Sequence, residues 1–454
     1  MSKNIIFHWS LVAGLAGFIF GFDTVVISGA NLPLKNLWHT TPFFHGFFIM
    51  SMALWGTLFG SIFGGYPADK LGRKKTLFWI GILFAVSAIG SAFANDPYTF
   101  SFFRFIGGIG IGASTVAAPI YISEISKANQ RGKLVALYQF NIVFGILIAY
   151  LSNYFFDGFD GVNDWRWMLG IMLLPSILYI FLVVGIPESP RWLITKKNDF
   201  ISARSILTKM GIANVNIEID LIVKANEKNN SNSKVNKFFT NQNKKIIWLA
   251  FFIAFFNQFS GINFVLYYAP EIFSTIGMNT KDSLFNSILL GCDILVFTLL
   301  GLYLIDKIGR KKLLIIGSIG YIVSLTMIAG CFYGNLNSNL LLFFLLLFIA
   351  SHSIGQGTVI WVFISEIFPN SLRATGQSFG ASIHWGCAAL ITLFTPFFFD
   401  KNEGIFNSNP WIIFCFFSIM MILQFIWVVN KVSETKGISL EDLESKFTNN
   451  INNK

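Results

Sequence analysis

The stretch "ADKLGRKK" at residues 68–75 occurs a second time, as "IDKIGRKK" at residues 305–312. Two further motifs repeat in the same order along the chain. "SEISKANQRG" at 123–132 is matched by "SEIFPNSLRA" at 365–374, and "PESPRW" at 187–192 is matched by "SETKG" at 433–437. Three paired motifs in one order indicate that the chain consists of two duplicated halves.

The composition is that of a membrane protein. Hydrophobic residues make up 54% of the 454 residues and charged residues only 12%, and the mean hydropathy is +0.62. Soluble domains carry about 25% charged residues. Apolar runs of about 20 residues are long enough to cross a bilayer as helices. Barrel strands are excluded because the runs lack the alternation that such strands require.

We expect an all-α membrane protein with twelve transmembrane helices in two pseudo-symmetric six-helix halves. The expected spans are 5–29, 44–66, 76–94, 99–121, 134–155, 167–186, 246–273, 284–305, 313–334, 340–366, 374–398 and 410–430. They divide the chain into an N-terminal half (1–187), a cytoplasmic loop (188–245), a C-terminal half (246–432) and a cytoplasmic tail (433–454). In the loop we expect short amphipathic helices, followed by disorder in the polar stretch 226–237.

The charges predict the orientation of the spans. The net charge is +10, and basic residues cluster at 70–75, 127–133, 191–245 and 307–312. The alternate loops carry acids instead, namely Asp96, Asp157, Asp160, Asp164, Asp282, Asp400 and Glu403. By the positive-inside rule the basic loops are cytoplasmic, so both termini lie inside. We expect a multi-pass protein of the cell (inner) membrane whose basic excess attracts anionic lipid rather than nucleic acid.

The motifs together resemble those of a known family. They include "GFIFGFDTVVISGA", "DKLGRKK", "PESPRWL", "NQFSGINFVLYYAPEIF", "DKIGRKK", "WVFISEIFPNSLRATG" and "SETKG", and they cover nearly the whole chain. The chain is similar to the sugar porters of the major facilitator superfamily, in particular to bacterial proton-coupled pentose and hexose porters. This resemblance implies the major facilitator fold and import of a monosaccharide by alternating access, with the substrate bound between the halves.

A carboxylate lies inside the first apolar run. A charged Asp at the centre of a span costs about 2.5–3.5 kcal/mol, so Asp23 should face the bundle interior. Arg104 is the only strongly basic residue deep in an N-half span. Because a nearby Arg lowers the pKa of an Asp and desolvation raises it, we predict that Asp23 and Arg104 form a proton-coupling site. The alternative is a structural ion pair that never titrates.

Amides and aromatic rings in the spans are candidates for sugar binding. Amides both donate and accept hydrogen bonds, as sugar hydroxyls do, and aromatic faces pack against sugar C–H groups. An isolated amide in a membrane helix can instead hold two helices together. The resemblance selects a set of substrate-binding candidates: Phe20, Gln139, Asn257, Gln258, Asn263, Tyr267, Gly357, Trp361 and His384.

Three positions depart from the family pattern, which leaves the sugar open. Asn257 stands where the family usually has Gln. Ile294 replaces an amide, with Asp293 beside it, and His384 stands where an amide is common. Asp293 and His384 could form a second titratable pair, or each could line the cavity or pair locally.

The repeated loop motifs predict ion pairs at the cytoplasmic helix ends. The resemblance implies that such pairs lock the outward-facing state, whereas charges that serve only topology would not require repeated acids. The candidate gating residues are Asp69, Arg73, Glu124, Arg131, Glu188 and Arg191 in the first half, and Asp306, Arg310, Glu366, Arg373 and Glu434 in the second.

Other classes of function receive less support. "GGIGIG" at 107–112 follows no strand and lies in a span, so it is not a dinucleotide fingerprint; its glycines predict close helix packing instead. No Walker motif and no nucleophile–base or metal-ligand constellation appears. We therefore expect no enzyme activity, no metal and no cofactor, and we expect a monomer to suffice for function. The rivals are proton-independent facilitated diffusion of a sugar or polyol on the same fold, and a membrane nutrient sensor.

Overall fold

The computed structural model describes residues 2–127, 130–231, 238–369 and 372–438. Throughout these ranges the regular secondary structure is helical. Eleven helices are long and apolar enough to cross a membrane, and one further pair, bent by 42°, supplies a twelfth span when it is counted as one. The expectation of an all-α protein with twelve spans is confirmed.

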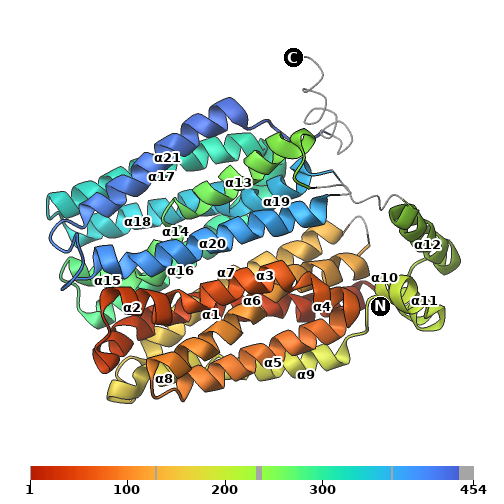
Figure 1. Ribbon diagram of the computed structural model, residues 1–454, viewed down its shortest axis with the longest axis horizontal. Helices are drawn as coiled ribbons and strands as arrows, with labels where there is room; N and C mark the ends of the chain where they lie inside the picture. The colour runs from red at the N-terminus through yellow and green to blue at the C-terminus, as the bar shows by residue number, and fades with distance from the viewer. Residues whose placement is uncertain (1, 128–129, 232–237, 370–371, 439–454) are drawn as a thin grey trace.

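The helices of the first half run side by side in Figure 1. They are α1 (Ser2–Trp38), the bent pair of α2 (Pro42–Phe44) with η1 (His45–Met50) and α3 (Met52–Phe63), α4 (Gly65–Lys70), α5 (Arg73–Ala92), α6 (Pro97–Ile125), α7 (Arg131–Phe156), η2 (Gly161–Asn163), α8 (Asp164–Gly170) and α9 (Leu173–Gly185).

The second half lies beside the first (Figure 1). It consists of η4 (Asn241–Asn243), α13 (Lys244–Gln258), α14 (Ile262–Tyr267), α15 (Ala269–Thr275), α16 (Thr280–Ile308), α17 (Arg310–Tyr333), α18 (Ser338–His352), η5 (Ser353–Gly357), α19 (Thr358–Ile367), α20 (Arg373–Phe399) and α21 (Trp411–Lys431).

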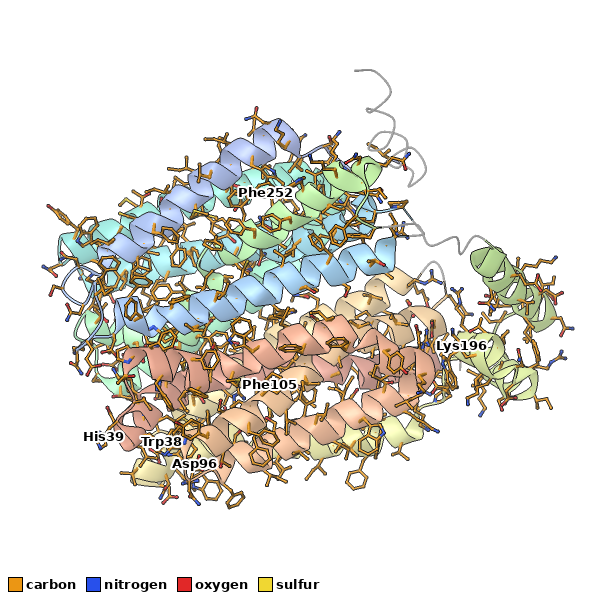
Figure 2. All side chains as sticks on the ribbon, in the orientation of Figure 1. Trp38, His39, Asp96, Phe105, Lys196 and Phe252 are labelled. Atoms are coloured by element: carbon orange, nitrogen blue, oxygen red, sulfur yellow. The ribbon has the colours of Figure 1, made fainter. Side chains whose placement is uncertain are left out.

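The two ends of the bundle differ in charge. One end carries both lysine-rich motifs, and we call it the basic end; the other carries Asp96, Asp282 and Asp400, and we call it the acidic end. Figure 2 shows Trp38, His39 and Asp96 at the acidic end and Lys196 at the opposite end. Large apolar side chains on the outer helix faces remain exposed, as with Phe181 (72% exposed) on α9, which suits contact with lipid.

The first helix is longer than its apolar run. We expect a span over 5–29, but α1 continues to Trp38. The extra turns keep an apolar face, because Ala30 and Leu34 are fully buried. Their polar residues, Asn31 and Lys35, have partners on neighbouring elements. The helix therefore extends through a polar stretch that sequence reasoning places in a loop.

The seventh span is broken into three helices. α13 ends at Gln258, and Gly261 adopts a φ of +86°, a conformation that only glycine enters readily. A Cβ at this position would also come within 2.8 Å of the Phe417 ring. A second break at Tyr268 separates α14 from α15. The breaks leave the segment around Asn263 free to project polar groups toward the bundle interior.

Glycines let α3 and α6 pack backbone to backbone, as the small-residue spacing predicts. A Cβ on Gly56 would lie 2.2 Å from the carbonyl oxygen of Phe105, and one on Gly108 would lie 2.0 Å from that of Ala53. Gly112 is equally close to Thr57. These positions exclude any larger residue without movement of the backbone.

Four short helices form the segment between the halves and lie at the basic end, next to the first half (Figure 1). They are α10 (Pro190–Trp192), η3 (Leu193–Lys197), α11 (Phe200–Lys209) and α12 (Val215–Ser231). The disorder predicted for 226–237 is wrong at its start, because α12 reaches Ser231. Buried Ile219 and Ile222 anchor this helix. Residues 232–237 lie outside the described ranges, as does the tail from 439 onward.

Candidate functional site

The predicted coupling pair is formed in the interior of the first half. Arg104 of α6 donates from Nη1 to the Asp23 carboxylate of α1, and from Nη2 to the Asp23 carbonyl oxygen at 3.2 Å. Asp23 is 0% exposed and Arg104 is 1% exposed. A buried ion pair loses most of its hydration, so its remaining hydrogen-bonding atoms need partners.

Two atoms of this pair do not have such partners. Asp23 Oδ2 and Arg104 Nε make no hydrogen bond to any residue that the structure describes. Tyr267, on α14 of the second half, lies close enough to interact electrostatically with both members. The pair thus lies inside the first half, within electrostatic reach of the second half, and one of its carboxylate oxygens has no hydrogen bond to the described residues.

Three of the predicted sugar-binding amides form one cluster at the break in the seventh span. Gln258 Nε2 donates to Asn257 Oδ1 at 3.0 Å, and Asn263 Nδ2 donates to Gln258 Oε1 at 2.8 Å. All three residues are buried. Gly261 lies between these residues in a left-handed conformation, at the break that ends α13 before α14 begins.

Histidine and tryptophan side chains from two other helices complete this cluster. His384 of α20 lies with its ring nitrogens 3.1 and 3.2 Å from Gln258 Nε2. The Trp361 ring of α19 has its centroid 5.1 Å from that of His384. On the first half, Phe20 of α1 packs edge-on against Trp385, with centroids 5.6 Å apart. Trp385 in turn contacts His384, with ring centroids 4.7 Å apart, so aromatic rings connect Phe20 to the cluster.

The remaining sugar-binding candidates, Gln139 and Gly357, lie outside this cluster. Gln139 on α7 is partly buried and is not linked to the amide cluster by any hydrogen bond among the described residues. Gly357 ends the π-turn η5, where a Cβ would lie 3.0 Å from the His352 ring. His352 in turn bonds the Tyr321 hydroxyl at 2.5 Å. Gly357 thus makes room for the buried polar pair of His352 and Tyr321.

The alternative pairing of Asp293 with His384 is not formed. The His384 nitrogens face Gln258 instead. Asp293 Oδ2 is buried and makes no hydrogen bond within the described ranges. The amide cluster holds the imidazole, so His384 belongs with the sugar-binding candidates.

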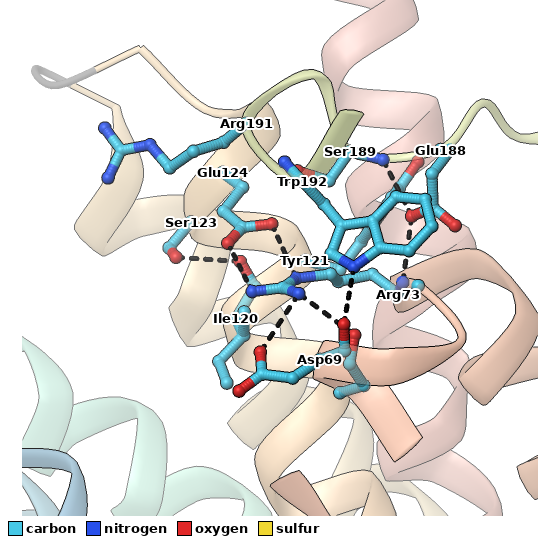
Figure 3. Close-up of polar contacts among 12 residues, drawn as sticks. Asp69, Arg73, Ile120, Tyr121, Ser123, Glu124, Glu188, Ser189, Arg191 and Trp192 are labelled. Carbon is cyan, nitrogen blue, oxygen red and sulfur yellow. Dashed lines mark hydrogen bonds and ion pairs between the residues drawn. The ribbon is translucent and has the colours of Figure 1, made fainter. Parts of the chain in front are cut away.

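Ion pairs at the basic end repeat in the two halves. Arg73 binds Glu124 through Nε (2.9 Å) and Nη2 (3.0 Å), and it also reaches Asp69 at 3.2 Å. Figure 3 shows this network in the first half. Two parallel N–H bonds to one carboxylate fix both distance and direction.

In the second half Arg310 binds Glu366 in the same way, at 2.8 and 3.2 Å, and reaches Asp306 at 3.2 Å. Each of these networks lies within one half.

Glu188 and Glu434 act as helix caps. Glu188 accepts hydrogen bonds from the backbone N–H groups of Arg73 (2.9 Å) and Lys74 (3.1 Å). Glu434 accepts from Arg310 (2.9 Å) and Lys311 (3.1 Å). These N–H groups have no partner inside their own helices, and the helix dipole favours an anion there.

Partial burial tends to raise the pKa of the Glu434 carboxyl, but the backbone N–H groups of Lys436, Arg310, Lys311 and Thr435 outweigh it and lower this pKa. The ionised form of the cap is therefore the one that the fold stabilises.

Three predicted gating arginines form no ion pair with the residues that the structure describes. Arg131 donates from Nε to the Ser123 carbonyl oxygen at 3.1 Å instead of binding Glu124. Arg191 is exposed and points away from the network (Figure 3). Arg373 has Nε and Nη2 buried with no hydrogen bond to the residues described. Glu124 and Glu366, the acids of the two networks, are already bound by Arg73 and Arg310.

Sequence reasoning missed a set of contacts between the halves at the acidic end. Lys35 binds the Asp400 carboxylate, and Asn31 donates to the Glu271 carboxylate. Both contacts join α1 to the second half. The signal that could have found them is weak: a lysine and an asparagine at helical spacing beyond the apolar run, and a glutamate after a proline. Nothing in the sequence says that these residues meet.

The chain is similar to known transporters over nearly its whole length. Residues 9–447 match the family of sugar (and other) transporters. The arabinose-proton symporter of Bacillus subtilis (strain 168) is 35% identical over 456 residues, which cover 98% of this chain and 95% of that protein. The D-xylose-proton symporter of Escherichia coli (strain K12) is 32% identical over 479 residues, with 98% and 96% covered.

Solved structures agree with this similarity. The xylose transporter XylE from E. coli in a partially occluded inward-open conformation has a TM-score of 0.84 and 30% identity, covering 96% of this chain and 100% of that one. XylE, described as a major facilitator superfamily proton:xylose symporter, with 6-bromo-6-deoxy-D-glucose bound, has a TM-score of 0.81 and 32% identity, covering 98% and 100%.

Proposed function

The chain belongs to the family of sugar (and other) transporters, and we propose that it imports a monosaccharide together with a proton by alternating access. Its fold is that of the major facilitator superfamily, a transporter family rather than an enzyme family. We place it in the cell membrane as a monomer, with the basic end and both termini in the cytoplasm, because basic loops favour the inner side. We call the basic end inner and the acidic end outer.

The observation that carries the proton-coupling proposal is the geometry of Asp23. Its carboxylate is buried, binds Arg104 through one oxygen and leaves the other oxygen without a partner among the described residues. A proton on that oxygen would cancel the charge that holds Arg104. Two states of one buried pair, reached by one proton, are what coupling to a change of conformation requires.

The proposed substrate site is the amide cluster of Asn257, Gln258 and Asn263 with His384 and Trp361. Its donors and acceptors are close together and buried, and Trp361 supplies an aromatic face. Gln139 and Phe20 would approach the sugar from the first half, and Tyr267 from the segment next to Asp23. The symporters of arabinose and xylose named above support a small sugar as substrate.

In the proposed cycle, protonation of Asp23 from outside loosens its hold on Arg104. The sugar then binds between the halves, and the inner side opens and releases first the sugar and then the proton. The family resemblance led us to expect that the inner ion pairs lock the outward-facing state. Because the pairs of Arg73 and Arg310 each join helices of one half, we propose instead that they fix the helix ends within each half while the halves rotate.

One observation favours the rival function, passive transport on the same fold. Arg104 makes two contacts with Asp23, and a pair held this firmly could remain ionised throughout. Measurement of proton movement separates the two functions. In liposomes with the purified protein and an internal pH dye, addition of a transported sugar outside should acidify the lumen at equal starting pH.

A panel of pentoses, hexoses and polyols would first identify the substrate, by uptake of labelled sugar. If a transported sugar enters without acidification, transport is passive. The matched control is a sugar from the same panel that is not taken up, which should leave the dye signal unchanged.

A further inference from the structure

The outer ends of the two halves are joined by polar side chains that the transport cycle described above does not use. Lys35 of α1 binds Asp400, which ends α20, and Asn31 of α1 binds Glu271 of α15. Asn31 is itself positioned by His45, whose Nε2 lies 2.5 Å from Asn31 Oδ1, while Thr40 lies 2.8 Å from His45 Nδ1.

These contacts are shielded from solvent. The side chains of Lys35 and Asp400 are 15% and 10% exposed, and Asn31 and His45 are each 1% exposed. Glu271 and Glu403 both contribute to the electrostatic environment of Lys35. Burial is the largest influence on Lys35 and opposes its charge, while the acids of the opposite half favour it. Removing one partner of such a shielded pair leaves a buried charge uncompensated, which an exposed pair does not.

The position of these contacts is what gives them a function. The ion pairs of Arg73 and Arg310 at the inner end join helices of the same half, so they can persist when the halves rotate. Lys35–Asp400 and Asn31–Glu271 cross between the halves. When the outer side opens, α1 moves away from α15 and α20, and both contacts must break.

We propose that Lys35 and Asn31, with Asp400 and Glu271, form an outer latch that holds the outer mouth closed and must open in every transport cycle. The latch rests on alternating access, part of the proposed function, but not on proton coupling. Its loss should shift the resting protein toward outward-open conformations. It should raise access to the outside without changing which sugar is bound, because none of its members belongs to the amide cluster.

The test measures the distance between the outer ends of the halves. Spin labels are placed at Phe155, at the outer end of α7 (72% exposed), and at Leu336, between α17 and α18 (48% exposed), in a protein whose four cysteines are replaced by serine. Pulsed electron resonance then gives the distance distribution without sugar and without a pH gradient. The latch predicts that D400N and E271Q each increase the ratio of long to short distances by about tenfold.

Two further variants make the result specific. K35D with D400K, which exchanges the charges, should restore the wild-type distribution, whereas K35D alone should not. K401Q removes an exposed neighbouring charge that makes no described contact with the latch and should change nothing. Unchanged distances in both D400N and E271Q would overturn the proposal. Because this readout needs no substrate, a passive or a coupled transporter would give the same answer, so the failure of proton coupling is a separate result.

Discussion

Replacing Asp23 by Asn removes one charge from a buried pair and keeps its shape. The amide oxygen of Asn can still accept a hydrogen bond from Arg104, but the negative charge is gone. The site then carries a permanent positive charge, as the proposed protonated state does. D23N therefore imitates one of the two states of the cycle and cannot reach the other.

The structure sets the size of two effects. Both side chains are essentially unexposed, and removing one partner of a buried pair costs about 3–5 kcal/mol of stability. Because Asn still offers Arg104 an acceptor, we expect D23N to lose about 3 kcal/mol of stability, at the lower end of this range. For transport, one pH unit across the membrane supplies about 1.4 kcal/mol per proton, which is about tenfold in sugar concentration.

The assay is accumulation of labelled sugar in liposomes with the lumen one pH unit more alkaline and the membrane potential clamped at zero. Wild type should accumulate sugar about tenfold over the outside, and D23N should stop at equal concentrations. Exchange of labelled for unlabelled sugar at equal pH should continue in D23N, because exchange needs no net proton movement. This second measurement separates lost coupling from lost folding.

The matched control is D282N. Asp282 is an exposed acid near the start of α16 at the outer end, so its loss removes the same charge without touching the buried pair. It should accumulate sugar as wild type does. Accumulation in D23N, or a wild type that ignores the pH gradient, would refute the reasoning and leave the ion pair a structural one.

Three further outcomes follow from individual contacts. In H384Q, an amide replaces the ring that lies 3.1 Å from Gln258. We expect the ratio of KM for pentoses to KM for hexoses to differ severalfold from that of wild type, with little change in kcat. The same ratio as in wild type across the sugar panel would contradict this role. In G72A, a Cβ would lie 2.3 Å from Glu188 Oε2 at a φ of +102°. The variant should therefore lose about 1–3 kcal/mol of stability and melt at a lower temperature than wild type. In the control G65A, nothing lies within 4 Å of the added Cβ, so this variant should melt as wild type does. E434Q should be less stable than wild type at neutral pH, and this difference should vanish as the pH falls through the pKa of Glu434, which is lowered below its usual 4.5. The reason is that a group with a depressed folded pKa stabilises the fold only while it is ionised. A difference that stays constant down to pH 3 would show that the cap acts by shape alone.

The fold could be predicted because its signals are local and repeated. Each span is an apolar run of sufficient length, and the paired motifs show where the second half begins. The partner of Asp23 followed by elimination, since Arg104 is the only comparable basic residue in an N-half span. The amide cluster could be predicted in part, because Asn257, Gln258 and Asn263 lie within one or two helical turns of each other in the sequence.

The missed contacts depend on geometry between distant segments. Arg73 forms ion pairs with both Asp69 and Glu124, and Arg131 donates to a carbonyl oxygen instead. The spacing of the motifs does not predict which of the two arginines pairs with the acid. Lys35 lies 365 residues from Asp400 in the chain. Such a pair depends on how the halves meet, and single-sequence patterns carry no information about that.

The placement of charge along the transport axis gives the two ends different roles. At the inner end the ion pairs of Arg73 and Arg310 stay within a half, so they keep each half rigid and add nothing to the cost of separating the halves. At the outer end Lys35 and Asp400 hold the halves together. In the proposed orientation, opening to the outside must break the contact of Lys35 with Asp400, whereas the described ion pairs of Arg73 and Arg310, each within one half, can persist when the inside opens. A resting protein with these contacts favours the conformation closed to the outside, and the free energy of sugar and proton binding has to offset the loss of the outer contacts.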